Sequence, residues 1–474
     1  MNASIPAVST RLPWRSRSRV RVSIRGSKAG ASWEAPLVIS GSVILAVRLF
    51  LLVSRYAVNI FYNDQWDFYD ATLFQKHPLW EIFRWQYGPH RLGLGPLISK
   101  LLEPYFRWNS RGEAFLATAI VTAAAVAALY LKTRLWGRLR WFDLAIPLIF
   151  FTPAQFESLW ITPDLAHGPL PVLLMVLYCL ALTCEAAATR YTLALLLNFV
   201  AIYTGFGLLI GFITPLWLLL DYCSRREGRR SANWLLVLLA LSLASLGSFF
   251  VGYRLDPDAQ CFSLQPHGVV RYLNFTALML AHFLGARSSR PFVWELLGGV
   301  LLAAMLWVVA SFGKRLWNRR SYAGRNLIPG ILVGYGLIFC AATAYGRACF
   351  GPYVAFSSRY TEYVELGMLG LYLYALQLDA PGFLRPWARK LLPGLLLAFL
   401  AMGAGAVQRE DRIDMRYYYT AKESWRKCYL KTEDIQGCDK AAQFTIYPVA
   451  ERTGLKEKLE FLKRTKQNLY SASP

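Results

Sequence analysis

The sequence predicts an all-α polytopic membrane protein, a bundle of helices that crosses the bilayer many times. Charged residues make up only 17% of the 474 residues, and the mean hydropathy is +0.32. Soluble domains usually carry about 25% charged residues. The apolar residues lie in separate runs, most of them near the length that a helix needs to cross a membrane. Composition and run length therefore point to the same fold class.

We predict about eleven transmembrane helices, and two ambiguous stretches decide this number. The apolar run 191–220 fits one long helix or two short ones, and 272–286 fits a span or an interfacial helix. Cytoplasmic loops are enriched in Lys and Arg. Counting two spans in the first stretch and none in the second places every strongly basic connecting segment in the cytoplasm. These segments are 132–140, 224–231, 313–325 and 385–390. The predicted spans are 35–54, 115–131, 144–160, 169–184, 191–205, 206–220, 234–253, 292–312, 327–346, 363–378 and 391–407.

This topology divides the chain into three parts. Residues 1–33 form a basic cytoplasmic arm, 34–407 a transmembrane bundle, and 408–474 a soluble tail on the outer side. The bundle carries two long outer loops, 55–114 and 254–291, and the first is expected to hold interfacial helices. The N-terminus is predicted inside and the C-terminus outside.

Charge and cysteine content narrow the functional classes. The net charge of +23 does not indicate nucleic-acid binding, because much of the Lys and Arg lies between apolar runs, where membrane topology explains it. No Cys or His pattern typical of a metal site occurs in the sequence. Cys428 and Cys438 lie on the predicted oxidising side and are close enough in sequence to form a disulfide.

The first outer loop begins with an acidic and aromatic motif, YNDQWDFYD, at residues 62–70. It places Asp64, Asp67 and Asp70 directly after the first predicted span. Acidic groups near a bilayer are costly unless they face water or a partner. Asp64 and Asp67 share one face if the segment is helical, because residues three apart are neighbours on a helix. This cluster is the leading candidate for a functional site, and a solvated loop anchored in the headgroup layer is the alternative.

Two further polar groups lie at predicted outer ends of spans. His90 and Arg91 belong to the motif GPHR in the first outer loop. Glu157 and Asp164 lie at the junction of the third and fourth spans, where several prolines break the helices and let the backbone line a cavity. A kinked turn with solvated acids is the structural alternative for this junction.

The loop between the ninth and tenth spans carries a third polar group. Arg347, Arg359 and Tyr360 lie at the outer ends of these spans. A guanidinium presents a fork of donors that suits phosphate. Anchoring in the headgroup layer by Arg and Tyr explains the same residues equally well.

Taken together, these features resemble the GT-C superfamily of integral-membrane glycosyltransferases, which use polyprenyl-phosphate-linked sugars. The likeness rests on the acidic motif after the first span, the long first outer loop, and the many-span bundle with an outward tail. The motifs GPHR, FESLW, GRACFG and SSRY, together with the Cys-containing tail, make the chain similar to a bacterial group of GT-C-like proteins.

The resemblance implies a reaction and roles for the residues. A sugar would pass from a lipid-linked donor to a glycan, lipid or protein of the cell envelope, on the outer face of the bacterial inner membrane. Asp64 would be the general base, and Asp67 a second candidate as base or as ligand of a divalent cation if one is used. The donor phosphate would bind Arg359, Arg347, His90 and Arg91, and the sugar or acceptor would bind Glu157, Asp164 and Tyr360.

The motif departs from the family pattern in its spacing. Many relatives carry adjacent or nearly adjacent acids, whereas Gln65 and Trp66 separate Asp64 from Asp67 here. The spacing leaves the identity of the base open between the two aspartates.

Three alternatives to a glycosyltransferase remain. A polymerase or ligase of lipid-linked polysaccharides shares the substrates but is expected to place its long functional loop later in the chain. A transporter or flippase would explain broken helices and Arg48 inside the first span, yet the spans show no inverted repeat. A fold can also persist without its activity, which leaves a non-catalytic scaffold.

Overall fold

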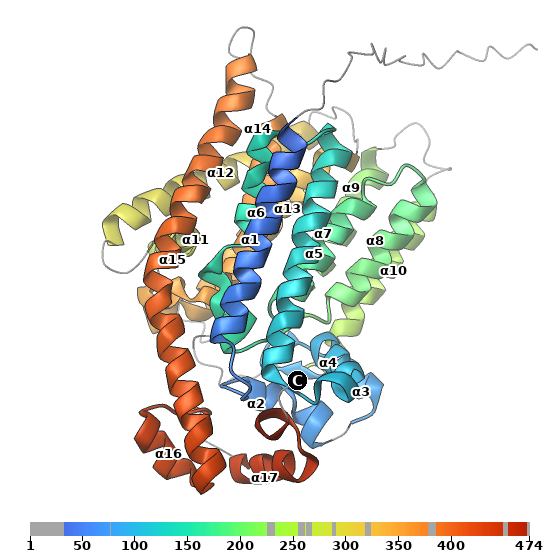
Figure 1. Cartoon of the computed structure of the whole chain (residues 1–474). Coiled ribbons are helices and arrows are strands. Elements are labelled where there is room, and N and C mark those ends of the chain that lie inside the picture. The colour runs from blue at the N-terminus through green and yellow to red at the C-terminus, as the bar shows by residue number, and fades with distance from the viewer. Residues whose placement is uncertain are drawn as a thin grey trace, which may run out of the picture.

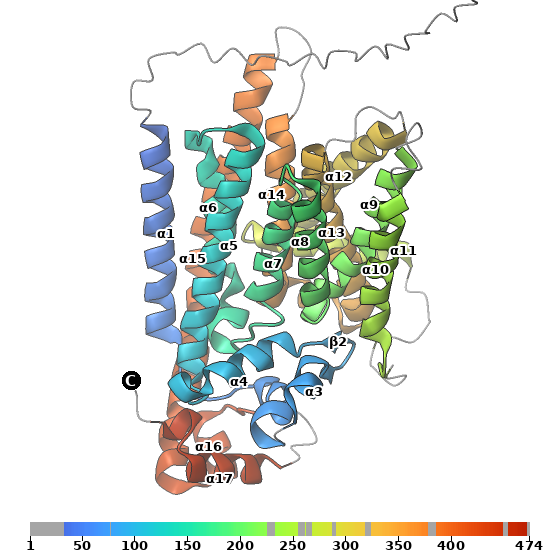
Figure 2. The ribbon, with the colours of Figure 1, turned by 90° about the vertical axis from the view of Figure 1, so that its right-hand side faces the viewer.

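The computed structural model describes residues 33–75, 77–224, 233–254, 261, 268–286, 291–317, 324–377, 385–448 and 454–471. The all-α prediction is confirmed, because helices dominate these residues. Within them, the strands are limited to one antiparallel pair of two residues each, β1 (Gln86–Tyr87) and β2 (His90–Arg91). The helices pack side by side as a bundle, and the first outer loop covers one end of it (Figures 1 and 2).

The bundle is built from helices that follow one another along the chain. They are α1 (Glu34–Tyr56), α5 (Ser110–Trp136), α6 (Ala145–Phe150), α7 (Pro169–Ala181), α8 (Ala187–Ala201), α9 (Leu208–Ser224), α10 (Asn233–Phe250), α11 (Val269–Phe283), α12 (Pro291–Trp317), α13 (Gly324–Arg347), α14 (Thr361–Gln377) and α15 (Arg385–Thr432). The outer loop and the tail add α2 (Gln65–Phe68), α3 (Leu79–Phe83), α4 (Leu94–Phe106), α16 (Ile435–Ala442) and α17 (Leu455–Thr465).

In the described residues, six helical stretches are long and apolar enough to cross a membrane, which makes this a helical membrane protein. Three shorter apolar helices accompany them: Pro169–Ala181, Ala187–Ala201 and Pro393–Gly405. The count of about eleven spans stays a prediction. The six are Glu34–Tyr56, Ser110–Trp136, Gly205–Cys223, Asn233–Phe250, Phe292–Arg315 and Leu327–Phe350.

The predicted third span, 144–160, is not one continuous helix. After the short α6, Pro153 opens a 3₁₀ turn (Pro153–Gln155), and a π-helical turn follows (Glu157–Ile161). Proline cannot donate a backbone hydrogen bond and clashes with the preceding helical turn, so it ends α6 here. Short π-helical turns are frequent at functional sites. Glu157 therefore lies on irregular backbone inside the protein.

The stretch 272–286, which we did not count as a span because of the positions of the basic loops, forms most of α11. Its C-terminal part is buried, and it packs tightly against α12. A Cβ atom on Gly298 of α12 would lie 1.7 Å from the carbonyl oxygen of Ala277, so only glycine permits this approach. Helix α11 is therefore part of the bundle packing.

The first outer loop and the tail share a second hydrophobic core below the bundle. Helix α15 runs the length of the bundle and continues beyond it, and the loop lies between the bundle and α16 and α17 (Figures 1 and 2). Phe61 and Trp66 of the loop pack with Trp425 and Leu459 of the tail. Because this core is shared, the aromatic residues Trp66, Phe68 and Tyr69 of the acidic motif are buried together with tail residues.

Two disulfides tie together the segments at this end of the protein. One joins Cys428 of α15 to Cys438 of α16, which is the pair that the sequence suggests, and their Cα atoms are 5.6 Å apart. The other joins Cys261 to Cys349, and it connects the segment after α10 to the segment after α13. Both lie on the side of the acidic motif.

Candidate functional site

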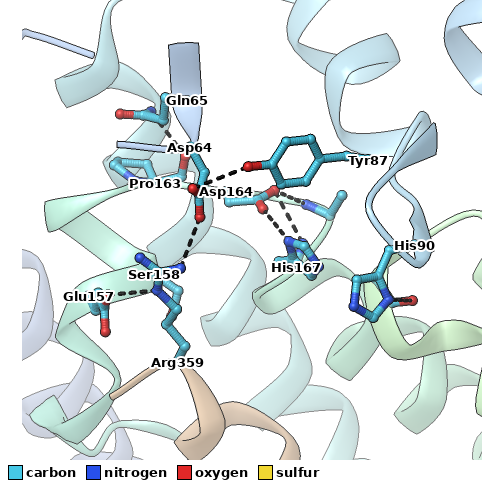
Figure 3. A network of polar contacts seen from close by, with 12 residues as sticks. Asp64, Gln65, Tyr87, His90, Glu157, Ser158, Pro163, Asp164, His167 and Arg359 are labelled. Atoms are coloured by element: carbon cyan, nitrogen blue, oxygen red, sulfur yellow. Dashed lines mark hydrogen bonds and ion pairs between the residues drawn. The ribbon is translucent and has the colours of Figure 1, made fainter. Parts of the chain in front are cut away.

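Three charged side chains from distant parts of the chain meet where the bundle joins the first outer loop (Figure 3). Arg359 Nη1 lies 2.9 Å from Asp64 Oδ2, and Arg359 Nε lies 2.6 Å from Glu157 Oε1. The three side chains keep between 21% and 38% of their surface exposed, so solvent or a ligand reaches them. Burial acts to lower the pKa of Arg359, but the carboxylates of Glu157 and Asp64 outweigh it and raise this pKa. The guanidinium therefore stays charged.

Backbone and amide contacts fix Asp64 in this position. Asn63 adopts a left-handed conformation with φ 53°, which asparagine tolerates well, and its N–H donates to Ile446 O of the tail at 2.8 Å. The buried amide of Gln65 donates to Pro163 O at 3.0 Å and accepts the N–H of Tyr62 at 3.1 Å. Asp64 is thus held between the tail and the junction that carries Glu157.

Arg359 lies on a short turn, Ser358–Tyr360, that leads into α14. The N–H of Glu157 donates to Ser358 Oγ at 3.1 Å, and Ser357 Oγ donates to Glu157 Oε2 at 3.3 Å. The serines of the motif SSRY therefore fasten this turn to the π-helical turn of Glu157. The ion pair between Arg359 and Glu157 therefore joins two turns that are also held together by hydrogen bonds.

The hairpin β1–β2 places a tyrosine and a histidine toward the site. Tyr87 OH donates to Asp64 Oδ1 at 3.2 Å (Figure 3). In the hairpin, Tyr87 pairs with His90 and Gln86 pairs with Arg91. Directly paired residues share one face of a sheet, and neighbours in sequence face opposite sides. Tyr87 and His90 therefore face the site, whereas Gln86 and Arg91 face away from it.

His90 is partly buried and contacts a second histidine. Its Nδ1 lies 3.2 Å from Gly205 O, and its ring centroid is 4.8 Å from that of His167. Because a carbonyl oxygen only accepts, Nδ1 carries the proton and Nε2 is left as an acceptor. Burial, and secondly the imidazole of His167, lower the pKa of His90 well below its usual value. His90 is therefore neutral at physiological pH and does not supply the positive charge expected of a phosphate ligand.

Asp164 is turned toward its own loop. Its Oδ1 accepts the N–H groups of Ala166 at 2.9 Å and His167 at 3.2 Å, and its Oδ2 lies 3.0 Å from His167 Nδ1. The carboxylate is buried and its oxygens are occupied by these contacts. Asp164 is thus placed to orient His167, which the sequence analysis did not include among the site residues.

Asp67 has other direct partners than Asp64, although the charge of Asp64 reaches it. Tyr447 OH of the tail donates to Asp67 Oδ1 at 2.6 Å, and Asp70 pairs with Lys458 of the tail at 2.8 Å. Burial raises the pKa of Asp67, although the hydrogen bond from Tyr447 opposes this shift. Across the described residues, no three His, Cys, Asp or Glu side chains gather as metal ligands would. The two aspartates therefore face different partners.

The other predicted phosphate ligands occupy different positions. Arg91 donates to the backbone oxygens of Phe249 at 2.8 Å and Val251 at 2.7 Å, which holds the end of α10 to the hairpin. Arg347, at the end of α13, lies near enough to His90 and Tyr360 that its charge acts to lower the pKa of each. Arg347 borders the site on the His90 side, whereas Arg91 lies outside it.

A buried lysine from α15 lies behind the site. Lys422 Nζ donates to Ile161 O at 2.8 Å and is 5.6 Å from the ring centre of Tyr62. Burial lowers the pKa of Lys422 to about 7. Nothing in the sequence indicates this residue, because we predict a soluble tail beyond residue 407. Tyr87 and Gln65 were also missed, and only their proximity to the motifs GPHR and NDQWD could have suggested them.

Fold and site together define a helical membrane protein with a polar cluster at one end of its bundle, beneath a helical outer loop. Comparison with known protein families, curated proteins and solved structures finds no match to this chain.

Proposed function

We propose that this protein is a membrane glycosyltransferase that moves a sugar from a polyprenyl-phosphate-linked donor to a glycan, lipid or protein acceptor. The reaction would take place on the outer face of a bacterial inner membrane, with the N-terminus in the cytoplasm. The main support is the Asp64–Arg359–Glu157 cluster, which combines a carboxylate base with a fixed cation at the end of a membrane bundle. The family resemblance of the sequence motifs is the second support.

The proposed reaction assigns Asp64 the role of general base. The acceptor hydroxyl takes the position of the Tyr87 hydroxyl at Asp64 Oδ1, and Asp64 accepts its proton as the oxygen attacks the anomeric carbon. The bond between this carbon and the phosphate oxygen breaks at the same time. The proton ends on Asp64, and the phosphate leaves with the bonding electron pair.

Arg359 stabilises the leaving phosphate in this scheme. A guanidinium has five N–H donors, and Arg359 uses Nε on Glu157 and Nη1 on Asp64. Among the residues that the structure describes, no side chain or carbonyl is bonded to Nη2, and in this scheme it binds a phosphate oxygen. A donor fixed in advance, where negative charge develops, lowers the barrier without reorganisation. Glu157 holds the guanidinium in place, which gives it a positioning role beside its predicted contact with the sugar.

The transporter alternative began from Arg48 inside the first helix. In the structure, Arg48 Nη2 donates to Phe151 O at 3.0 Å. This contact fastens α1 to the end of α6, so helix packing accounts for the arginine without a transport pathway. We therefore keep transfer as the single proposed activity.

A transfer assay with purified protein in liposomes tests the proposal. Polyprenyl-phosphate sugars and cell-envelope acceptors are supplied, and Asp64→Asn is compared with the wild type and with Asp70→Asn, whose partner is Lys458. We expect Asp64→Asn to lower turnover by about a hundredfold or more, because a base contributes roughly 10²–10⁴-fold. Asp70→Asn should keep its turnover. Equal turnover in Asp64→Asn and the wild type would remove the proposed base.

A further inference from the structure

The second face of the hairpin borders a cavity that the proposed mechanism does not use. The cavity has a volume of about 800 Å³ and is lined by Gln86 and Arg91 of the hairpin, Arg84 after α3, and Arg254 after α10. This volume lies in the range of small-molecule sites. Because neighbouring strand residues face opposite sides, Tyr87 contacts Asp64 while Gln86 faces the cavity.

The cavity carries positive charge. Arg84, Arg91 and Arg254 contribute three guanidinium groups, and none of them is paired with a carboxylate among the residues that the structure describes. The acid in the lining is Glu81, which pairs with His77 at 2.6 Å. The lining therefore has a surplus of positive charge that an anionic ligand would neutralise.

The walls of the cavity are held together by hydrogen bonds. The side chain of Gln86 donates to Arg254 O at 2.6 Å and accepts the N–H of Arg254 at 3.0 Å. Arg84 Nη2 and Arg91 Nη2 both donate to Val251 O, at 2.8 and 2.7 Å. These bonds join two segments more than 150 residues apart, and before any ligand binds they fix the side chains of Arg84 and Arg91 and the backbone of Arg254. Preorganised sites of this kind lose less entropy on binding.

The composition of the lining indicates the ligand class. Trp85 also lines the cavity, and its indole stacks on the ring of Tyr87 with centroids 5.9 Å apart. A saccharide ring has an apolar face that stacks on an indole, and its carboxylate matches the planar donor fork of arginine. Gly88 and Arg254 also line the cavity, and both are exposed.

We propose that this cavity binds an anionic saccharide, with Arg254 and Arg84 on its acidic group and Trp85 against its ring. As an acceptor site it rests on the proposed function, since only a transferase would need an acceptor. The cavity would then hold the acidic part of the acceptor on one face of the hairpin, while the reacting hydroxyl lies on the Asp64 face.

Direct binding to the full-length protein in detergent tests this proposal. The probes are oligogalacturonate as an anionic saccharide, maltooligosaccharide of equal length as a neutral one, and inorganic pyrophosphate as an anion without a ring. The variants are Arg254→Gln and Glu81→Gln, with Arg464→Gln as control, because Arg464 is exposed on α17 and lies outside the cavity. Thermal unfolding of each variant checks that it is folded.

We expect oligogalacturonate to bind the wild type, and Arg254→Gln to weaken it by about tenfold through loss of one charged contact. Glu81→Gln should strengthen binding, Arg464→Gln should leave it unchanged, and added salt should weaken it. Maltooligosaccharide binding as tight as oligogalacturonate, binding of pyrophosphate alone, or an unaffected Arg254→Gln would each overturn the proposal.

The same experiment separates this inference from the proposed function. In Asp64→Asn, transfer should be lost while oligogalacturonate binding still depends on Arg254, because Arg254 lies on the other face of the hairpin. Saccharide binding through Arg254 without any transfer would refute the transferase and keep the binding site. Transfer in wild type without such binding would refute the site alone.

Discussion

The nine residues of YNDQWDFYD supply two acidic regions with opposite surroundings. Asp64 faces the bundle, where it pairs with Arg359, about three hundred residues later in the chain. Glu157, about a hundred residues after Asp64, pairs with the same arginine. Asp67 and Asp70 face the tail, where Tyr447 and Lys458 satisfy them. The three aspartates are alike in sequence, and only their tertiary partners differ.

The difference between the two regions separates a site from an anchor. On the bundle side, one cation serves two carboxylates, so a ligand can compete with either of them for it. On the tail side, each acid has its own partner, and the contacts join the motif to a shared hydrophobic core. Changes on the bundle side should therefore alter activity, whereas changes on the tail side should alter stability.

After Asp64→Asn, the largest effect is expected from Arg359→Gln. The variant loses the charge that would stabilise the leaving phosphate, and it leaves Asp64 and Glu157 without their common cation. Loss of one such donor typically costs about 10²–10³-fold in turnover. Turnover of lipid-linked sugar by purified protein in liposomes measures this effect.

Two further variants make this result specific. Arg359→Lys keeps the charge but not the fork that joins both acids, so it should recover only part of the activity. Arg107→Gln, an exposed arginine of the first outer loop, should behave as the wild type. If Arg107→Gln lost as much turnover as Arg359→Gln, the effect could not be assigned to the cluster.

The fold class followed from the sequence because hydrophobic burial in a bilayer needs long apolar runs, which composition reveals directly. The apolar segment 144–160 shows the limit of this reasoning. Its hydropathy predicts a span, but Pro153 breaks the helix and the chain turns into the site. Apolar run length alone does not show where a helix is interrupted.

The site was predictable only as far as local motifs reach. Asp64, Glu157 and Arg359 were all candidates, yet nothing in the sequence joins positions 64, 157 and 359 into one cluster. His90 and Arg91 were assigned one role because they are adjacent, whereas the strand pairing turns them to opposite faces. Only the folded structure shows that these residues lie on a strand and which face of the hairpin borders the site. The adjacency of His90 and Arg91 in the sequence does not show this.

A smaller effect, on stability, is expected from Lys422→Met. Lys422 lies between the two regions, because it holds Ile161 of the bundle from α15 and contacts Tyr62 of the motif. Burial lowers its pKa to about 7 in the folded protein, so the unfolded state binds more protons between pH 7 and its usual range near 10. The free energy of unfolding of the wild type should therefore rise with pH in this window, by up to about 1.4 kcal/mol per pH unit.

Thermal unfolding of the detergent-solubilised protein at pH 7, 8 and 9 measures this pH dependence. Lys422→Met removes the titrating group and keeps the length of the side chain. The free energy of unfolding of the variant should therefore exceed that of the wild type most at pH 7, and this excess should shrink toward pH 9. A difference that stayed constant over this range would show that Lys422 does not titrate there.

The smallest effect is expected from Tyr447→Phe, on the tail side. The variant removes the hydroxyl that donates to Asp67 and keeps the ring in its buried position. A hydrogen bond to a charged group contributes about 1.5–3 kcal/mol, so the free energy of unfolding should fall by about 2 kcal/mol. Turnover at a temperature where the variant is folded should match the wild type, because Asp64 keeps its partners. Tyr353→Phe is the matched control, since Tyr353 is 67% exposed.

A double-mutant cycle with Asp67→Asn decides whether the lost stability belongs to this contact. If the two side chains act as a pair, Asp67→Asn should lower the free energy of unfolding clearly less in the Tyr447→Phe variant than in the wild type. If Tyr447→Phe instead lowered turnover at unchanged stability, Asp67 would belong to the reaction. The acidic motif would then serve one site with two aspartates, and the separation of its two faces would be wrong.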